Sequence, residues 1–135
     1  MARIAREPIE ARDVAARVAH AGAGAVLTFA GVVRDNHLGR KVLGIEYHAY
    51  EAMAAKEMER IEEEARSRWP GIAIDMAHRL GKLHVGAASV VIAVASPHRG
   101  DGFAALRYAI DKLKETVPIW KKEIYEDGSA WIEGS

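Results

Sequence analysis

Hydrophobic positions at helical spacing define the clearest element of the chain. They form one stripe of small and apolar side chains: Ala54, Met58, Ile61, Ala65 and Trp69. A stripe of this kind is typical of a helix that covers a core. Glu62 and Arg66, like Glu64 and Arg68, are four residues apart, so we expect ion pairs on the outer surface of this helix. The Pro-Gly pair at residues 70–71 predicts its end.

Two further helices are predicted from weaker patterns. Val14 and Val18 lie one turn apart among alanines and charged residues, which indicates a short helix over residues 9–21. A longer helix is expected over residues 102–116, with Asp101 as its N-cap.

Strand-like runs separate these helices. They are rich in β-branched residues and too short for typical helices, and they occupy residues 25–33, 42–50, 72–80 and 88–96. The polar stretch 35–41 is interpreted as a loop, and the stretch 81–87 as tight turns, because both contain glycine. A hairpin is expected about Asp127 and Gly128 near the end of the chain.

The order of these elements favours an α+β fold with a largely antiparallel sheet and about three helices. A split βαβ sandwich is the nearest generic alternative. Half of the 135 residues are hydrophobic, which is enough for a single domain over residues 1–135. The sequence contains no internal repeat, low-complexity stretch or linker.

Composition excludes several classes of function. The 19 Lys and Arg residues balance the 19 Asp and Glu residues, so no overall field favours nucleic acid or an anionic membrane. The absence of cysteine removes thiolate chemistry and disulfides. The histidines show no metal-ligand spacing, and no dinucleotide, Walker or nucleophile-elbow motif occurs, so neither a metal nor a cofactor is expected. Without a signal-like or membrane-spanning segment, a cytoplasmic protein is the simplest interpretation.

Cationic side chains recur where the predicted elements end. Arg34 follows the first long strand, and His98 and Arg99 lie between the last buried strand and the helix after it. An arginine fork beside the free N–H groups of a helix start suits a phosphate or a carboxylate. The alternative is that His98 and Arg99 only cap the strand or pair with glutamate, and the residues alone do not decide between the two.

Two lysines of the third predicted helix differ in their positions around it. At about 100° per residue, Lys114 borders the apolar stripe beside Arg107, whereas Lys112 faces water. A lysine at an apolar margin usually extends its ammonium to solvent. Held instead in a partly dry pocket near other cations, Lys114 would have a lowered pKa and could act as a general base or an amine nucleophile.

A second lysine pair precedes the expected hairpin. Strand alternation places Lys121 on one face and Lys122 on the other, so only one of them can point into a given cleft. The pattern does not say which. Trp120 and Trp131 are expected in the core, since isolated aromatic residues in apolar strands usually pack inside.

Seven segments, taken in chain order, form a recognisable set. They are FAGVVRD (29–35), EYHAYEAMA (46–54), ARSRWPG (65–71), HRLGKLHVG (78–86), SPHRGDGFAALRYAIDKLK (96–114), VPIWKKE (117–123) and DGSAWIE (127–133). Together they resemble the family of large, catalytic subunits of molybdopterin synthase. The resemblance spans nearly the whole chain, and it implies that family's fold, of the α/β hammerhead type.

The resemblance implies an enzyme, a sulfurtransferase of molybdenum cofactor biosynthesis. In this family the large subunit is a homodimer within a heterotetramer, and each copy receives the C-terminal Gly-Gly tail of a small ubiquitin-like sulfur-carrier subunit. That tail ends in a thiocarboxylate. Two sulfurs pass to cyclic pyranopterin monophosphate (precursor Z), whose cyclic phosphate opens as the dithiolene of molybdopterin forms. The lack of cysteine fits this scheme, because the sulfur arrives on the partner.

The resemblance also assigns residues to a site. It implies that Lys114 and Lys121 are catalytic, and that the pterin is bound by a wider set: Arg34, His98, Arg99, Phe29, Val32, Val33, Lys122 and Glu123. The two lysines, Arg34, His98 and Arg99 are expected to converge around one cavity that admits the partner's tail. Val32 and His48 depart from residues common in the family.

Two other classes of function stay open at this point. The chain could be a non-catalytic pterin- or anion-binding module, in which case loss of Lys114 or Lys121 should leave turnover unchanged. It could instead be an interaction scaffold for a ubiquitin-like protein. Binding of the tail should then survive loss of Arg34 and Arg99.

Overall fold

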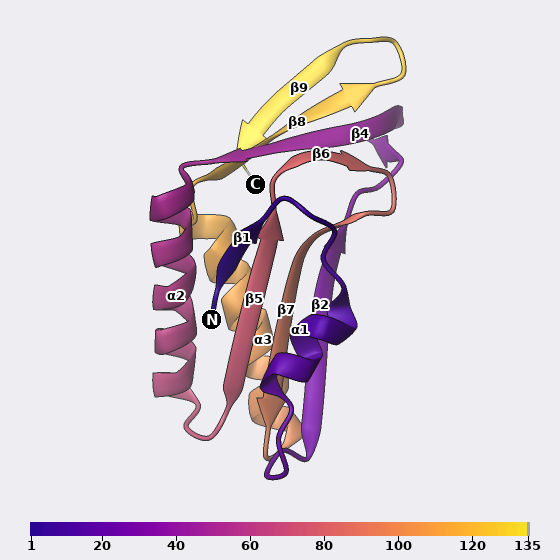
Figure 1. The fold of residues 1–135 in the computed structure, drawn as a ribbon. Coiled ribbons are helices and arrows are strands. Elements are labelled where there is room, and N and C mark those ends of the chain that lie inside the picture. The colour runs from indigo at the N-terminus through magenta and orange to yellow at the C-terminus, as the bar shows by residue number, and fades with distance from the viewer. Residues whose placement is uncertain (135) are drawn as a thin grey trace.

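The computed structural model describes residues 1–134, in which three helices and nine strands form two sheets (Figure 1). The helices are α1 (Ala11–Val18), α2 (Glu51–Arg68) and α3 (Arg99–Thr116). The strands are β1 (Arg3–Ala5), β2 (Ala25–Val32), β3 (Asn36–His37), β4 (Arg40–Ala49), β5 (Ala73–Arg79), β6 (Gly81–His84), β7 (Ala88–Ser96), β8 (Ile119–Tyr125) and β9 (Ala130–Gly134). Over residues 1–134, no helix combines the length and apolarity that crossing a membrane requires.

The first sheet has the strand order β1-β5-β7-β2 and carries helices on both faces (Figure 1). Strand β7 lies inside this sheet, and all of its residues after Ala88 are buried. Its alternate small residues meet α1 on one side: Val91, Ala93 and Ala95. The residues between them join the main core under α2 and α3: Val90, Ile92 and Val94. Burial on two faces explains why this strand is apolar without a polar alternation.

The second sheet lies across one end of the first (Figure 1). Its order is β3-β4-β8-β9, and β6 pairs with β4 as well. Side chains of this sheet join the same main core that α3 enters: Val42, Ile45, Tyr47, Leu83, Ile119 and Tyr125. The chain passes from the end of α3 directly into β8, so the last turn of that helix and the start of this strand are held together. This junction brings Lys114, in the last turn of α3, close to Lys121 near the start of β8.

The α+β fold with three helices and mostly antiparallel pairing is confirmed, and the differences lie in short elements. The only parallel strand pair among residues 1–134 joins β1 to β5. The loop expected over residues 35–41 contains β3 and the start of β4, and the turns expected over residues 81–87 contain β6. Two to four residues are too few to show a period, so only their pairing reveals them.

The predicted start of the third helix is wrong by three residues. Helix α3 begins at Arg99, with His98 at the N-cap, and Asp101 lies within the first turn. The hydroxyl of Ser96 donates a hydrogen bond of 2.6 Å to the carbonyl oxygen of His98. This contact turns the chain directly from β7 into the helix, so Arg99, which was expected to lie before the helix, already belongs to α3.

The ion pairs expected on the outer surface of α2 are also wrong. Glu62 is buried and accepts a hydrogen bond of 3.1 Å from the backbone N–H of Ala2. Glu64 pairs with Arg60 and accepts a hydrogen bond from Tyr108 of α3. The β1 segment and α3 pack against faces of α2 that the helical pattern alone assigns to solvent.

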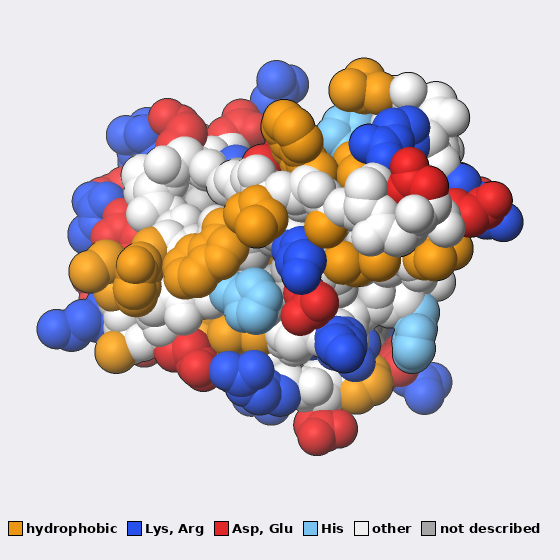
Figure 2. All heavy atoms as spheres, turned by 90° about the horizontal axis from the view of Figure 1, so that it is seen from above, with side chains coloured by type: hydrophobic (Ala, Val, Ile, Leu, Met, Phe, Trp, Pro, Cys, Tyr) orange, Lys and Arg blue, Asp and Glu red, His pale blue; other side chains and the backbone are white. Residues whose placement is uncertain are grey.

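The two tryptophans are less buried than expected. Trp131 is 54% exposed, because β9 is the edge strand of its sheet. Trp120 is half-buried and packs between the rings of His48 and Tyr50. Figure 2, which looks down on the end of the molecule that carries this sheet, shows hydrophobic side chains lying among charged ones on that face. Trp120 and Trp131 therefore belong to a surface, unlike the buried Tyr47 and Tyr125 of the same sheet.

Candidate active site

One pocket of about 110 Å³ brings together residues from both sheets and from α3. Its lining residues are Gly31, Val32, Arg34, Asn36, Val42, Ile45, Tyr47, Ser89, Lys114, Lys121 and Glu123. Three of the cations expected from the sequence, Arg34, Lys114 and Lys121, are therefore neighbours although they are separated widely along the chain.

Arg34 and Lys114 are each placed by the end of an element. The β2–β7 register shifts between Gly31 and Val32, and Arg34 follows where the pairing ends. A Cβ at Gly31 would lie 2.9 Å from the Cγ1 atom of Val90, so glycine permits the close strand contact beneath the pocket. Lys114 lies in the last turn of α3.

Lys121 is the lysine of its pair that enters the pocket. Its Nζ atom lies 3.5 Å from Oε1 of Glu123 and 3.3 Å from Oε1 of Glu133. Glu123 shares its strand face, and Glu133 is its register partner on β9. Lys122 points to the other face of β8 and does not line the pocket. The side chain of Lys121 is thus held between two carboxylates.

Glu123 is a buried carboxylate with several donors. Its Oε2 atom lies 2.6 Å from Nδ1 of His37 and accepts a hydrogen bond of 3.0 Å from the hydroxyl of Tyr125. Burial raises the pKa of Glu123, but the hydrogen bonds from His37 and Tyr125 and the charge of Lys121 outweigh it and lower this pKa overall. The carboxyl group is therefore ionised, and the Nδ1 atom of His37 must carry the proton that it donates.

Lys114 has a different electrostatic environment. Burial of its amine on the pocket side lowers its pKa, the charge of Lys121 lowers it further, and Glu133 opposes these effects. Within residues 1–134, Lys114 forms no ion pair, unlike Lys121. Lys114 is exposed as a residue, whereas Lys112 is half-buried. The expectation that Lys112 is the more exposed of the two lysines is therefore wrong. Lys114 lines the pocket, although the residue as a whole is exposed.

His98 and Arg99 lie at the opposite end of α3 from this pocket. They line an open hollow of about 580 Å³ together with Gly24, Ala25, Pro97 and Gly100. Arg99 precedes Lys114 by 15 helical residues, which corresponds to about 22 Å. The five cations therefore do not all converge within one copy of the chain.

The remaining residues of the expected site have different places. Val32 lines the pocket and is 55% exposed. Val33 is buried, and its backbone N–H and carbonyl group bond to Ala87 and Gly86 at the turn before β7. Phe29 is partly buried and packs against the main core. Phe29 and Val33 thus lie behind the pocket wall and do not line the pocket itself.

Several residues of the pocket and its surroundings were not expected from the sequence. They include Tyr47, Ser89 and Asn36 in the lining, and His37, Tyr125 and Glu133 behind Lys121. Strand alternation could have found Tyr125, because it shares a face with Lys121 and Glu123. The others arrive by strand pairing, which no local pattern reveals.

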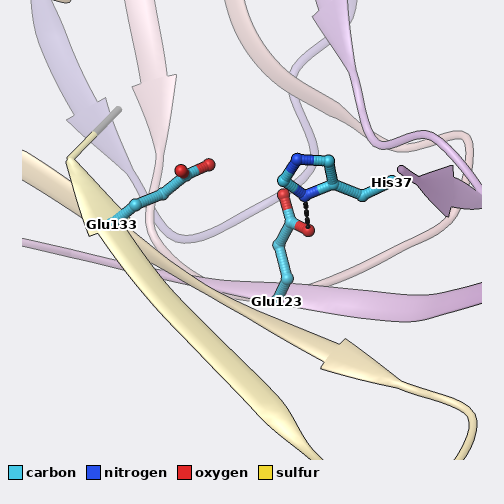
Figure 3. A group of neighbouring side chains, drawn as sticks. All are labelled: His37, Glu123 and Glu133. Carbon is cyan, nitrogen blue, oxygen red and sulfur yellow. Dashed lines mark hydrogen bonds and ion pairs between the residues drawn. The ribbon is translucent and has the colours of Figure 1, made fainter. Parts of the chain in front are cut away.

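The side chains around Lys121 include donor atoms of the kind that metals prefer. Atoms of His37, Glu123 and Glu133 lie within 4.8 Å of one another, and Figure 3 shows His37 directed at Glu123 with Glu133 reaching in from β9. Imidazole and carboxylate ligands suit Zn²⁺. The ammonium group of Lys121, however, already faces both carboxylates, so this cluster holds a cation that belongs to the protein.

Comparisons with known proteins agree with the fold. The family model described as MoaE protein matches residues 4–116. The chain belongs to the MoaE family.

The molybdopterin synthase catalytic subunit of Halalkalibacterium halodurans is 45% identical over 129 residues, which cover 96% of this chain and 83% of that protein. The crystal structure of molybdopterin synthase from Staphylococcus aureus is similar at a TM-score of 0.94 and 41% identity, over 98% of this chain and 96% of that one. A complex of subunits 1 and 2 of molybdopterin-converting factor from Helicobacter pylori contains a chain of the same fold, with a TM-score of 0.74, 22% identity and coverage of 93% and 86%. The resemblance stated from the sequence is confirmed at the level of the family.

Proposed function

We propose that this MoaE-family chain is the catalytic subunit of a molybdopterin synthase and transfers thiocarboxylate sulfur to cyclic pyranopterin monophosphate. The observation that carries the proposal is the convergence of Arg34, Lys114 and Lys121 on one pocket. Both reactants are anionic, one through its phosphate and the other through its thiocarboxylate. Cationic donors held in a partly buried pocket attract both of them and stabilise negative charge as it moves between them.

Arg34 suits the phosphate of the pterin. Its guanidinium group presents a planar fork of donors that matches phosphate oxygens. Its position directly after β2 places it on the rim of the pocket, opposite the strand that carries Lys121. We therefore assign Arg34 to binding.

The two lysines suit two different parts of the reaction. Burial of its amine and the charge of Lys121 lower the pKa of Lys114, and this direction favours a role in proton transfer. Lys121, held by Glu123 and Glu133, supplies a fixed positive charge. When sulfur bonds to a pterin carbon and water takes its place on the carrier tail, the tail leaves as a carboxylate, and this charge stabilises it.

The size of the pocket supports a site shared between two copies of the chain. Pockets for small molecules usually have about 300–1,000 Å³, and the pocket here has about 110 Å³. His98 and Arg99 have the chemistry for a phosphate, but they lie at the other end of α3. In a homodimer, the His98–Arg99 end of one copy would complete the Lys114–Lys121 end of the other.

The proposed sulfur donor is a small ubiquitin-like carrier whose Gly-Gly tail ends in the thiocarboxylate. The H. pylori structure of related fold is a complex of two different subunits of molybdopterin-converting factor. An extended tail with two glycines has no side chains to exclude it from a narrow pocket. The two catalytic subunits and two carriers would form a heterotetramer.

Reconstitution tests this function directly. The purified chain is mixed with a thiocarboxylated carrier and cyclic pyranopterin monophosphate, and the dithiolene product is measured by mass spectrometry. We expect product only when all three components are present and when the carrier ends in the thiocarboxylate. A carrier with an ordinary C-terminal carboxylate is the matched control. Absence of product with a carrier that is competent with another synthase would contradict the proposal.

A further inference from the structure

Both oxygens of the buried Glu123 side chain have partners. Oε2 receives His37 and the hydroxyl of Tyr125, and Oε1 faces the ammonium group of Lys121 at 3.5 Å. Figure 3 shows the imidazole directed at the carboxylate from the β3 side, across the sheet from Glu133. Glu123 is 3% exposed, so almost no water is available to orient it. The direction of its carboxylate is therefore set by His37 and Tyr125.

A short hairpin between β3 and β4 places His37 beside Glu123. Strand β3 has only two residues, and it pairs with β4 through a tight turn at Leu38 and Gly39. Both turn residues have positive φ, 51° and 81°, as a type I′ hairpin turn requires. Leucine is disfavoured in this conformation. The hairpin thus forms at a local cost, and it holds His37 over Glu123.

The ring of Tyr125 has a contact of its own, in addition to the 3.4 Å contact between its hydroxyl and Nδ1 of His37. Its ring lies under the guanidinium group of Arg40, 3.8 Å from the ring centroid, and the residue is buried. Its hydroxyl therefore reaches Glu123 from a side chain that has little freedom to move. Two donors from different elements, the β3–β4 hairpin and β8 itself, fix one carboxylate oxygen.

We infer that His37 and Tyr125 are positioning residues, which act through Glu123 to hold the ammonium group of Lys121 in the pocket. Without these donors, the buried carboxylate is no longer held in one orientation, and its ionised form is less stabilised. Lys121 would then keep only Glu133, which is partly exposed, as an anionic partner. The contact chain is independent of the reaction, whereas its catalytic consequence rests on the proposed function.

The first test measures Lys121 without any substrate. The folded protein is acetylated briefly with limiting reagent, and mass spectrometry of the β8 peptide gives the labelling ratio of Lys121 to Lys122, an internal reference on the same strand. We expect His37→Ala to raise this ratio several-fold, because Lys121 is released from Glu123. His37→Asn should keep the ratio near wild type, because the amide can donate to the same oxygen. Tyr125→Phe should have a smaller effect, and His84→Ala, which removes an exposed histidine elsewhere, should have none.

The second test uses the reconstituted reaction. His37→Ala should lower kcat by roughly ten- to a hundredfold, the size expected for a misplaced catalytic group, with little change in KM for the pterin, and His37→Asn should restore most of it. An unchanged labelling ratio in a folded His37→Ala protein would overturn the inference, whatever the activity. If His37→Ala changes the labelling ratio but the wild-type chain forms no product, the contacts from His37 to Lys121 stand and the proposed function is rejected. Thermal unfolding of each variant checks that the fold is intact.

Discussion

The two ends of α3 differ in how completely one copy of the chain builds a site. At the Lys114 end, Lys121 is paired with Glu123 and Glu133, and Glu123 is held by His37. At the Arg99 end, the cations stand at an open hollow, and neither forms an ion pair with any residue in 1–134. The buried hydrogen bonds and ion pairs around Glu123 orient Lys121 within one chain. The exposed cations His98 and Arg99 need a ligand or another subunit to orient them.

Removal of either lysine should have the largest effect. We expect Lys114→Ala and Lys121→Ala each to reduce the initial rate of dithiolene formation by at least about 10²-fold, the lower range for a positioned acid–base group. Lys112→Ala, two residues away on the same helix, is the control and should keep near-wild-type rates. A lysine variant that retained most of the activity would favour a binding module or scaffold over an enzyme.

Mixing two inactive variants should show whether the ends of α3 meet across a dimer. Arg99→Ala and Lys121→Ala subunits are combined after denaturation and joint refolding, and product formation is compared with that of each variant alone. Random pairing yields one intact shared site in half of the dimers, so about a quarter of wild-type activity should return. If both residues served the same site within one copy, the mixture would stay as inactive as its components.

The pH dependence of the free energy of unfolding should show how strongly His78, near Lys114, is shielded from water. Burial, the larger effect, and the charge of Lys114 lower the pKa of His78 to about 4, although its hydrogen bond with the Arg79 carbonyl opposes this. His78 therefore binds more protons in the unfolded chain between about pH 6.5 and 4, and its contribution to the free energy of unfolding should fall by up to about 3 kcal/mol as the pH decreases through this range. Glu62, whose pKa is raised to about 7 by burial, contributes with the opposite sign over a similar range, so the contribution of His78 has to be isolated.

His78→Phe isolates that contribution, because phenylalanine does not titrate. Between about pH 6.5 and 4, urea unfolding should show that the free energy of unfolding of the wild type falls relative to that of this variant, whatever the two stabilities at neutral pH. Parallel curves for the two proteins would mean that His78 is protonated as easily in the folded chain as in the unfolded one.

Relief of the β3–β4 turn should have the smallest effect. Leu38 is 89% exposed and has a φ of 51°, so Leu38→Asn removes little packing and relieves part of the strain. We expect the free energy of unfolding to rise by about 1 kcal/mol or less. Leu38→Ala keeps the strain and should give no gain. If both variants raised the free energy of unfolding equally, the gain would not come from relief of backbone strain in the turn.

Several features of this protein could be predicted because they depend on neighbours along the chain. The stripe of Met58, Ile61 and Ala65 identified α2, and the apolar run at residues 88–96 identified β7. Alternation placed Lys121 and Glu123 on one face of a strand. The separation of Arg99 from Lys114 was not predicted, because the expected helix began only at residue 102; the helix that includes both residues keeps them about 22 Å apart.

The tertiary structure decided what depends on strand pairing. Strands as short as β1, β3 and β6 show no period of their own, and they form because longer strands offer them hydrogen-bonding edges. The same pairing sets Glu133 opposite Lys121 and brings His37 to Glu123. Local patterns determined which elements exist and which face each side chain takes, because these follow from backbone geometry over a few residues. Which of those faces meet, and therefore which charges share a pocket, is decided by contacts between residues far apart in the chain, and only the folded molecule contains them.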